Sequence, residues 1–190
     1  HNDIPGVMQA SSVSTYVNRF GVAPGQKLVL ATNNDNAYRT ALDWQSAGRH
    51  VVAVVDSRSS PSGELVARVR ELGIQVLDGC GVIEAKGSKR VRSALVAPLN
   101  SEGTQVVGAV QNLACDLIAS SGGWSAAIHL SSHTGAKPVW DEKIVSFRPG
   151  ESKQQERSAG ACNGTFGLSD GLLEGSIAGA EAAHLAGFGD

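Results

Sequence analysis

Alternation between short apolar runs and amphipathic stretches, from residue 27 to residue 77, constrains the fold most strongly. The apolar runs, each of a length typical of a buried strand, are Lys27–Thr32 (KLVLAT), His50–Val55 (HVVAVV) and Ile74–Leu77. The stretches between them have apolar side chains at helical spacing, and each precedes a glycine that can end a helix; they are Asn36–Ala47 and Glu64–Leu72. This β-α-β-α-β order predicts an α/β fold with a Rossmann-like parallel sheet and right-handed crossovers.

A three-stranded antiparallel meander is expected next, because the following apolar runs are joined by connections too short for a helix. The expected strands are Val82–Ala85, Val91–Leu99 and Thr104–Leu113. The links Lys86–Ser88 and Asn100–Gly103 consist of polar residues and glycine, as is typical of hairpins. Outside this meander we expect a short helix at 12–20 and a short strand at 116–120, with irregular structure over 125–157.

The last predicted element is a long helix within Gly164–Leu185. Its glycines Gly171, Gly175 and Gly179 recur every four residues and therefore share one helical face. Each glycine lowers helix propensity by about 1 kcal/mol relative to alanine. Tertiary packing must compensate for this loss of helix propensity. We therefore expect close approach of the helix to a sheet or to a cofactor.

Composition narrows the class of protein further. The formal charge of −2 gives no reason to expect nucleic acid or an anionic membrane as a partner, and no apolar run is long enough to span a membrane. With 23 glycines and only 5% aromatic residues, the chain suits an α/β fold better than a β-sandwich. The three cysteines, Cys80, Cys115 and Cys162, form no CxxC pair, so we expect a reducing, cytoplasmic location without disulfides.

The first strand-to-helix junction, LVLATNNDNAY, lacks the glycines of a dinucleotide-binding GxGxxG turn. The side chains of Asn33, Asn34 and Asp35 would crowd a pyrophosphate, and the carboxylate would repel it. Asp35 or Asn36 could cap the next helix. We therefore predict that no dinucleotide pyrophosphate binds this loop. Asp56 lies where an acidic residue accepts a hydrogen bond from the ribose in NAD-binding folds. We interpret it instead as a solvated aspartate at a strand end.

Two small-residue segments are candidates for contact with a cofactor. In CDLIASSGGW a strand runs into glycines and a large planar side chain, and in SAGACNGTFGL small residues precede the last helix. The alternatives are a plain turn and an ordinary small-residue turn before a core helix. The candidate cofactor-binding residues are Gly122, Gly123, Trp124, Gly160, Asn163, Gly164, Thr165 and Phe166.

No complete catalytic or metal-binding motif is recognisable in the sequence. His129 and His133 are four residues apart in a loop-like stretch without the glutamate of HExxH, so we interpret them as a solvent-exposed pair. Ser131 and Ser132 do not lie in a GxSxG elbow, and Cys162 reads as a small buried hydrophobic residue. We predict no catalytic acid, base or nucleophile and no metal site.

Taken in order, the quoted segments resemble the α subunit of heterotetrameric sarcosine oxidase. GVMQASSVSTYVNRFGVAPGQKLVLATNNDNAY, HVVAVVDSRS, the meander, CDLIASSGGWSAAIHLSSHTGAKPVWDEKIVSFRPG and AGACNGTFGLSDGLLEGSIAGAEAAHLAGF together cover nearly the whole chain. Subunits of opine oxidase and hydrogen cyanide synthase are similar. The resemblance implies a glutathione-reductase-type fold with two dinucleotide lobes, of which this chain is an internal piece.

The resemblance also implies a division of the chain. Residues 25–112 would be an inserted NAD(P)-binding-like Rossmann lobe, and residues 1–24 and 113–190 would be flanking parts of a first lobe of the FAD/NAD type that ends in the long helix. The GxGxxG of that first lobe is expected upstream. An incomplete lobe exposes apolar surface, so we expect self-association of this piece.

Cofactors and partners follow from the same resemblance. Many relatives carry Gly-Asp where this chain has Gly160 and Ala161, so the resemblance implies NAD rather than FAD in the first lobe, with FAD and FMN associated with the complex. Amine oxidation would then involve other subunits, and the isolated piece would be inactive and bind nucleotide weakly or not at all. The alternatives are a non-enzymatic assembly domain without bound nucleotide and, disfavoured by the missing GxGxxG, a stand-alone NAD-dependent reductase.

Overall fold

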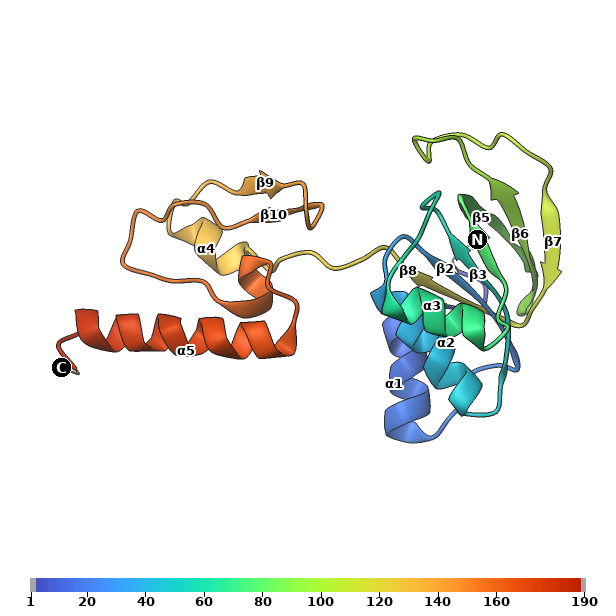
Figure 1. The fold of residues 1–190 in the computed structure, drawn as a ribbon, viewed down its shortest axis with the longest axis horizontal. Helices are drawn as coiled ribbons and strands as arrows, with labels where there is room; N and C mark the ends of the chain where they lie inside the picture. The colour runs from blue at the N-terminus through green and yellow to red at the C-terminus, as the bar shows by residue number, and fades with distance from the viewer. Residues whose placement is uncertain (1–2, 189–190) are drawn as a thin grey trace. The chain divides into compact units, whose positions relative to one another are not determined.

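The computed structural model describes residues 3–188 as two compact units, the first ending at Gly123 and the second beginning at Trp124 (Figure 1). The outermost residues of the predicted flanking segments, 1–2 and 189–190, lie outside the described residues. None of the described helices is both long enough and apolar enough to cross a membrane.

A five-stranded parallel sheet forms the centre of the first unit, in the order β1-β8-β2-β3-β4. Its strands are β1 (Val7–Gln9), β2 (Lys27–Thr32), β3 (His50–Asp56), β4 (Val76–Asp78) and β8 (Leu117–Ser121). The predicted β-α-β-α-β unit is confirmed as β2-α2-β3-α3-β4. The sequence did not predict that β8 returns to pair between β1 and β2, because strand pairing across some 90 residues leaves no local signal.

Three helices cover one face of the sheet: α1 (Ala10–Phe20), α2 (Asn36–Ser46) and α3 (Glu64–Glu71). Leu28 and Leu30 of β2 pack with Trp44 of α2 in one fully buried cluster. The indole Nε1 of Trp44 donates a hydrogen bond to the carbonyl oxygen of His50 at 3.2 Å, so its burial leaves no donor unpaired.

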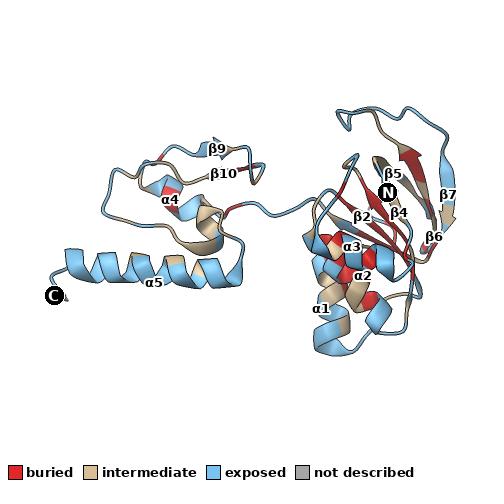
Figure 2. Ribbon diagram, in the orientation of Figure 1, coloured by how far each residue is buried: buried red, intermediate tan, exposed pale blue. Residues whose placement is uncertain are grey.

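The meander covers the other face. It consists of β5 (Cys80–Gly87), β6 (Val91–Pro98) and β7 (Gln111–Ala114), paired antiparallel in that order. Val29 of β2 and Val55 of β3 point to this side and pack with Val91 and Val96 of the meander. Figure 2 shows the buried residues concentrated on the central strands and the helix faces against them. Burial on both faces explains why the strand sequences are continuously apolar rather than alternating.

The third strand of the meander is shorter than predicted. Residues 104–110 form a loop with one isolated bridge, between Leu99 and Val106, and β7 begins only at Gln111. The side chain of Asn100 makes this turn, because its Oδ1 accepts hydrogen bonds from the backbone N–H groups of Thr104 at 2.8 Å and Gln105 at 3.1 Å.

The second unit has little buried apolar core. It contains α4 (His129–His133), the hairpin β9 (Val139–Asp141) and β10 (Ser146–Arg148), the 3-10 turn η1 (Gly160–Asn163) and α5 (Leu168–Leu185). The prediction of irregular structure over 125–157 is therefore wrong for α4 and the hairpin, which are too short to leave a periodic signal. The predicted long helix is confirmed, but it starts later than Gly164, because Gly164 is left-handed with φ +88° and ends the 3-10 turn instead. No residue of α5 is buried against the described chain.

The compact units and the predicted lobe boundaries do not coincide. Parts of both predicted flanking segments belong with the lobe predicted for residues 25–112: β1 and β8 join its sheet, and α1 packs in its core. How the chain is divided between the lobes of a longer protein stays a prediction.

Candidate functional site

The first candidate segment lies at the carboxyl end of β8, between the ends of β1 and β2. Gly123 has φ +94°, a conformation that strongly favours glycine. At Gly122 a Cβ atom would meet no described atom within 4 Å, so this backbone is open to a ligand. A shallow depression of about 260 Å³ lies beside it, and Thr32, Cys80 and Gly122 contribute to its lining. Ligands of open parallel sheets bind at this carboxyl edge.

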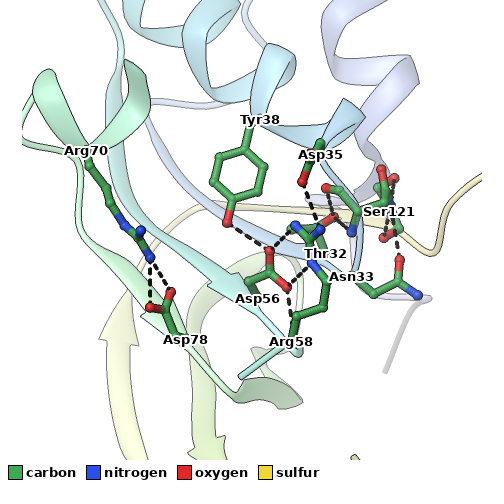
Figure 3. A network of polar contacts seen from close by, with 10 residues as sticks. Thr32, Asn33, Asp35, Tyr38, Asp56, Arg58, Arg70, Asp78 and Ser121 are labelled. Carbon is green, nitrogen blue, oxygen red and sulfur yellow. Dashed lines mark hydrogen bonds and ion pairs between the residues drawn. The ribbon is translucent and has the colours of Figure 1, made fainter. Parts of the chain in front are cut away.

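The neighbouring turn, which carries the asparagines of LVLATNNDNAY, is fixed by its own side chains (Figure 3). The Thr32 hydroxyl accepts a hydrogen bond from the Asn34 backbone N–H at 3.1 Å and donates one to the Asn34 carbonyl at 3.0 Å. Asp35 occupies the position before α2 but makes no capping hydrogen bond with its side chain. Its carboxylate instead forms an ion pair with Arg58 at 2.8 Å.

The interpretation of Asp56 as solvated is wrong, because its exposed fraction is 0%. Its Oδ2 accepts hydrogen bonds from the Tyr38 hydroxyl at 2.8 Å and from Arg58 at 2.7 Å, and its Oδ1 accepts from the Arg58 backbone N–H at 2.9 Å and from Nε at 3.1 Å. A buried carboxylate needs such partners. The carboxylate at the ribose-reading position is therefore already saturated by the chain itself.

Burial and the neighbouring carboxylate hold Tyr38 protonated. Burial is the largest cause of the raised pKa of Tyr38, and the hydrogen bond to Asp56 adds to it. The pKa of Arg58 is raised chiefly by the same carboxylate of Asp56. With Arg58 paired to both Asp35 and Asp56, the cluster carries one net negative charge where a dinucleotide fold would hold phosphate.

The second candidate segment is the 3-10 turn before α5. Gly160 donates its backbone N–H to Oε2 of Glu174 at 2.6 Å, and the Asn163 side chain donates to Oε1 at 2.5 Å. These two hydrogen bonds, with that of Asn163 the larger cause, lower the pKa of Glu174. The donors that a phosphate or ribose would use are thus taken by a carboxylate from α5.

The structure brings Gly160, Asn163, Gly164 and Thr165 together in this turn, where the Thr165 N–H donates to the Gly160 carbonyl at 3.0 Å. At Gly164 a Cβ atom would lie 2.7 Å from Ile144 Cδ1, so the small residue serves internal packing. The aromatic candidates are exposed: Phe166 to 39% and Trp124 to 54%. Of the eight candidates, Gly122 and Gly123 belong to the first unit and the others to the second.

The described residues contain no cluster of histidine, cysteine or carboxylate side chains suited to a metal ion. His129 and His133 are exposed as expected, although they lie at the two ends of the one-turn helix α4 rather than in a loop. Cys162 is half-buried, and its Sγ donates to the Ala159 carbonyl. Burial raises the pKa of the Cys115 thiol to about 11, so this thiol is inert at neutral pH.

Sequence reasoning missed Tyr38, Arg58 and Glu174. The spacing of Asp56 and Arg58, two residues apart, is a usable signal for a local ion pair at a strand end. The contact of Glu174 with residues 11 and 14 positions earlier has no such signal, because it depends on how the chain folds back before α5.

A parallel sheet covered by helices on one face and by an antiparallel meander on the other defines the dinucleotide-binding fold of thioredoxin-reductase-like flavoproteins. Solved structures with this fold align with nearly the whole chain. L-proline dehydrogenase from P. horikoshii aligns over 99% of this chain and 32% of its own, with a TM-score of 0.61 and 16% identity. Bacillithiol disulfide reductase from Staphylococcus aureus aligns over 96% of this chain and 56% of its own, also with a TM-score of 0.61 and 16% identity. These likenesses concern the fold alone.

The sequence is homologous to a region of sarcosine oxidase subunit alpha. It is 36% identical over 190 residues to that subunit of Corynebacterium sp. (strain P-1), covering 99% of this chain and 19% of the relative. It is 39% identical over 176 residues to that of Rhizobium meliloti (strain 1021), covering 92% of this chain and 16% of the relative. The chain thus spans about a fifth of the length of these curated relatives. No protein-family model matches the sequence.

Proposed function

We propose that this chain is part of the α subunit of a sarcosine oxidase-like, amine-oxidising flavoenzyme, in which it supplies the dinucleotide-fold scaffold and one side of an NAD site. The observation that carries the proposal is the identity of 36% along 99% of the chain with a sarcosine oxidase α subunit. Opine oxidase and hydrogen cyanide synthase subunits remain alternatives within the same class. In each case the enzyme would act on CH–NH donors only as the full complex, with FAD and FMN and with further subunits.

The open backbone at the exit of β8 supports contact with a nucleotide there. Gly122 is exposed, and Gly123 adopts a conformation that lets the chain turn without a side chain in the way. NAD, if bound, supplies an adenine dinucleotide whose diphosphate accepts hydrogen bonds from exposed N–H groups. In this proposal the backbone of Gly122 and Gly123 lies against the nucleotide. Contact of the candidates in the second unit with a nucleotide stays a prediction from the sequence.

A scaffold without any nucleotide is the second candidate, and two observations favour it. Arg58 and Tyr38 saturate Asp56, and Glu174 occupies the donors of Gly160 and Asn163. The pairing of Arg58 with both Asp56 and Asp35 fits a turn at 33–36 that supports its neighbours rather than holding a diphosphate. The hydrogen bonds to Glu174 count against Gly160 and Asn163 as direct ligands of a nucleotide. They do not involve Gly122 or Gly123.

The two candidates differ in the nucleotide content of the purified complex. The full-length α subunit is produced with its partner subunits, denatured in acid, and the released NAD is counted per subunit. About one NAD supports the NAD site, whereas no NAD and no thermal shift at millimolar NAD support the scaffold. Calorimetry on the 190-residue chain is expected to show no micromolar binding of NAD or FAD.

Gly123→Ala tests the proposed contact, with Gly103→Ala as the matched control. Both glycines are left-handed, with φ +94° and φ +69°, so both substitutions carry a similar backbone cost of about 1 kcal/mol. Only Gly123→Ala is expected to lower the NAD content of the complex. Equal NAD in both variants would remove Gly123 from the site.

A further inference from the structure

The side chain of Asn34 connects the first strand-to-helix turn to the exit of β8. Its Nδ2 donates to the Ser121 carbonyl at 3.2 Å and to the Ser121 Oγ at 3.0 Å. A Cβ atom on Gly123 would lie 3.9 Å from the same Nδ2 and 3.9 Å from Asn33 Oδ1. Two residues that the sequence places 87 positions apart, Asn34 and Ser121, are therefore in direct contact.

Asn34 is itself held firmly. The Thr32 hydroxyl bonds both its backbone N–H and its carbonyl, and the ion pair of Asp35 with Arg58 joins the same turn to the end of β3. The Asn34 Oδ1 is buried and accepts no hydrogen bond within the described chain. The side chain thus acts on β8 only as a donor.

The two glycines that follow Ser121 have few restraints of their own, although Ser121 itself pairs with Thr32 of β2. No described atom lies within 4 Å of a Cβ built on Gly122, and Gly123 has no side chain to fix its φ of +94°. Glycine backbones have more conformations to lose than any other residue on ordering. The Asn34 amide therefore adds a second fixed contact, beside the sheet pairing of Ser121, at the point where the two glycines begin.

We propose that Asn34 is a positioning residue, whose amide fixes the exit of β8 so that the backbone of Gly122 and Gly123 faces the nucleotide. The inference rests on the proposed NAD contact at these glycines. It gives the asparagine-rich turn a role that does not require it to bind a nucleotide itself.

Asn34→Asp in the full-length subunit, assembled with its partner subunits, tests the donor. Aspartate has the same size, but it turns an oxygen toward the Ser121 carbonyl and lacks the N–H. NAD is expected to dissociate about tenfold faster than from the wild type, the size of effect that follows from losing one such hydrogen bond. Asn34→Ala is expected to have a smaller effect in the same direction. The exposed neighbour Asn36, as Asn36→Ala, is the matched control and is expected to be unchanged.

Hydrogen exchange at the amides of Ser121, Gly122 and Gly123, measured in the same proteins after NAD has been removed from all of them, separates positioning from direct contact. Faster exchange there in Asn34→Asp, but not in Asn36→Ala, supports the inference. Acid that protonates the new carboxyl group should partly restore slow exchange, because a carboxylic acid can donate again.

The outcomes distinguish this inference from the function on which it rests. Wild-type complex without NAD overturns both. Wild-type complex with NAD, and unchanged NAD dissociation in Asn34→Asp, overturns the positioning role alone. Faster NAD dissociation with unchanged exchange at residues 121–123 also overturns it, because Asn34 would then act on the nucleotide directly.

Discussion

Asp56 and Asp78 are register partners at the carboxyl ends of β3 and β4, and each pairs with an arginine. Their surroundings differ. Asp56 is fully buried and has Tyr38 as a further donor, whereas the pair of Asp78 with Arg70 is exposed, with side-chain fractions of 37% and 44%. Burial, rather than the presence of an ion pair, decides how much each aspartate stabilises the fold.

Asp56→Ala is expected to lower the free energy of unfolding by about 3 kcal/mol, because it leaves the Tyr38 hydroxyl and part of the Arg58 guanidinium without their acceptor. Asp78→Ala, the matched control on the next strand, is expected to cost less than about 1 kcal/mol. Urea unfolding of both variants measures the difference. Equal losses would show that the Asp56 cluster contributes no more than a surface ion pair.

The contact of Glu174 with Asn163 and Gly160 is expected to depend on pH. Because the folded pKa of Glu174 is lowered, the contact stabilises the turn fully above the ordinary glutamate pKa and loses this contribution as the pH falls through the lowered value. Nuclear magnetic resonance signals of the Asn163 side-chain amide should shift over that acidic range. In Glu174→Gln the shift should disappear, and a shift that persists there would assign it to another group.

At the scale of elements, α5 differs from the helices of the first unit. Helices α1, α2 and α3 each bury residues against the sheet. Helix α5 buries none against the described chain, and its apolar side chains Leu172 and Leu173 are 67% and 63% exposed. The expected close approach of the glycine stripe to a sheet is not found within the described chain: a Cβ atom on Gly171 would lie 3.6 Å from Gly160 Cα of the 3-10 turn, an ordinary contact distance. A Cβ atom built on Gly175 or Gly179 would have no described atom outside the local helix backbone within 4 Å.

Gly175→Ala is therefore expected to stabilise α5 in this 190-residue chain, by about 0.5–1 kcal/mol, because alanine is the better helix former and its methyl group meets open space. Thermal unfolding followed by circular dichroism measures the change. The same substitution in the full-length subunit should be neutral or destabilising if another segment packs on the stripe. A loss of helix stability in the short chain would contradict the expectation.

At the scale of the whole molecule, the exposed leucines of α5 predict self-association of the chain on its own. Light scattering is expected to give a mass above that of one 19.6 kDa chain. Leu172→Glu should reduce the mass toward the monomer. Leu72→Glu, which changes a leucine of 51% exposure next to α3, should not. A clean monomer in the wild type would count against the prediction.

The elements of the first unit were largely predictable, because each depends on neighbours in sequence. The run KLVLAT predicts β2 with its observed bounds, and the helical spacing after Asn36 predicts α2 within one residue. The seventh strand was predicted too long, because the side chain of Asn100 folds the chain into a turn where apolar content alone favours a strand.

The candidate site was predictable only in part. Glycines follow β8 in the sequence, and the structure places them at the carboxyl end of this inner strand, where the Gly122 backbone is open. The sequence did not predict the hydrogen bonds of Asp56 to Tyr38 and Arg58, or those of Glu174 to Gly160 and Asn163. Each depends on side chains reaching across a turn, and the direction of a side chain is set by packing rather than by residue type.

By itself, the sequence determined most of the strands and helices of the first unit and the long last helix, and that no glycine-rich phosphate turn follows β2, because apolar periodicity and residue size act locally. Only the tertiary structure decided that Asp56 is buried between Tyr38 and Arg58 and that Asn34 reaches Ser121. Those contacts exist because parallel strands distant along the chain end at one edge of the same sheet, where the polar side chains that follow them must satisfy one another.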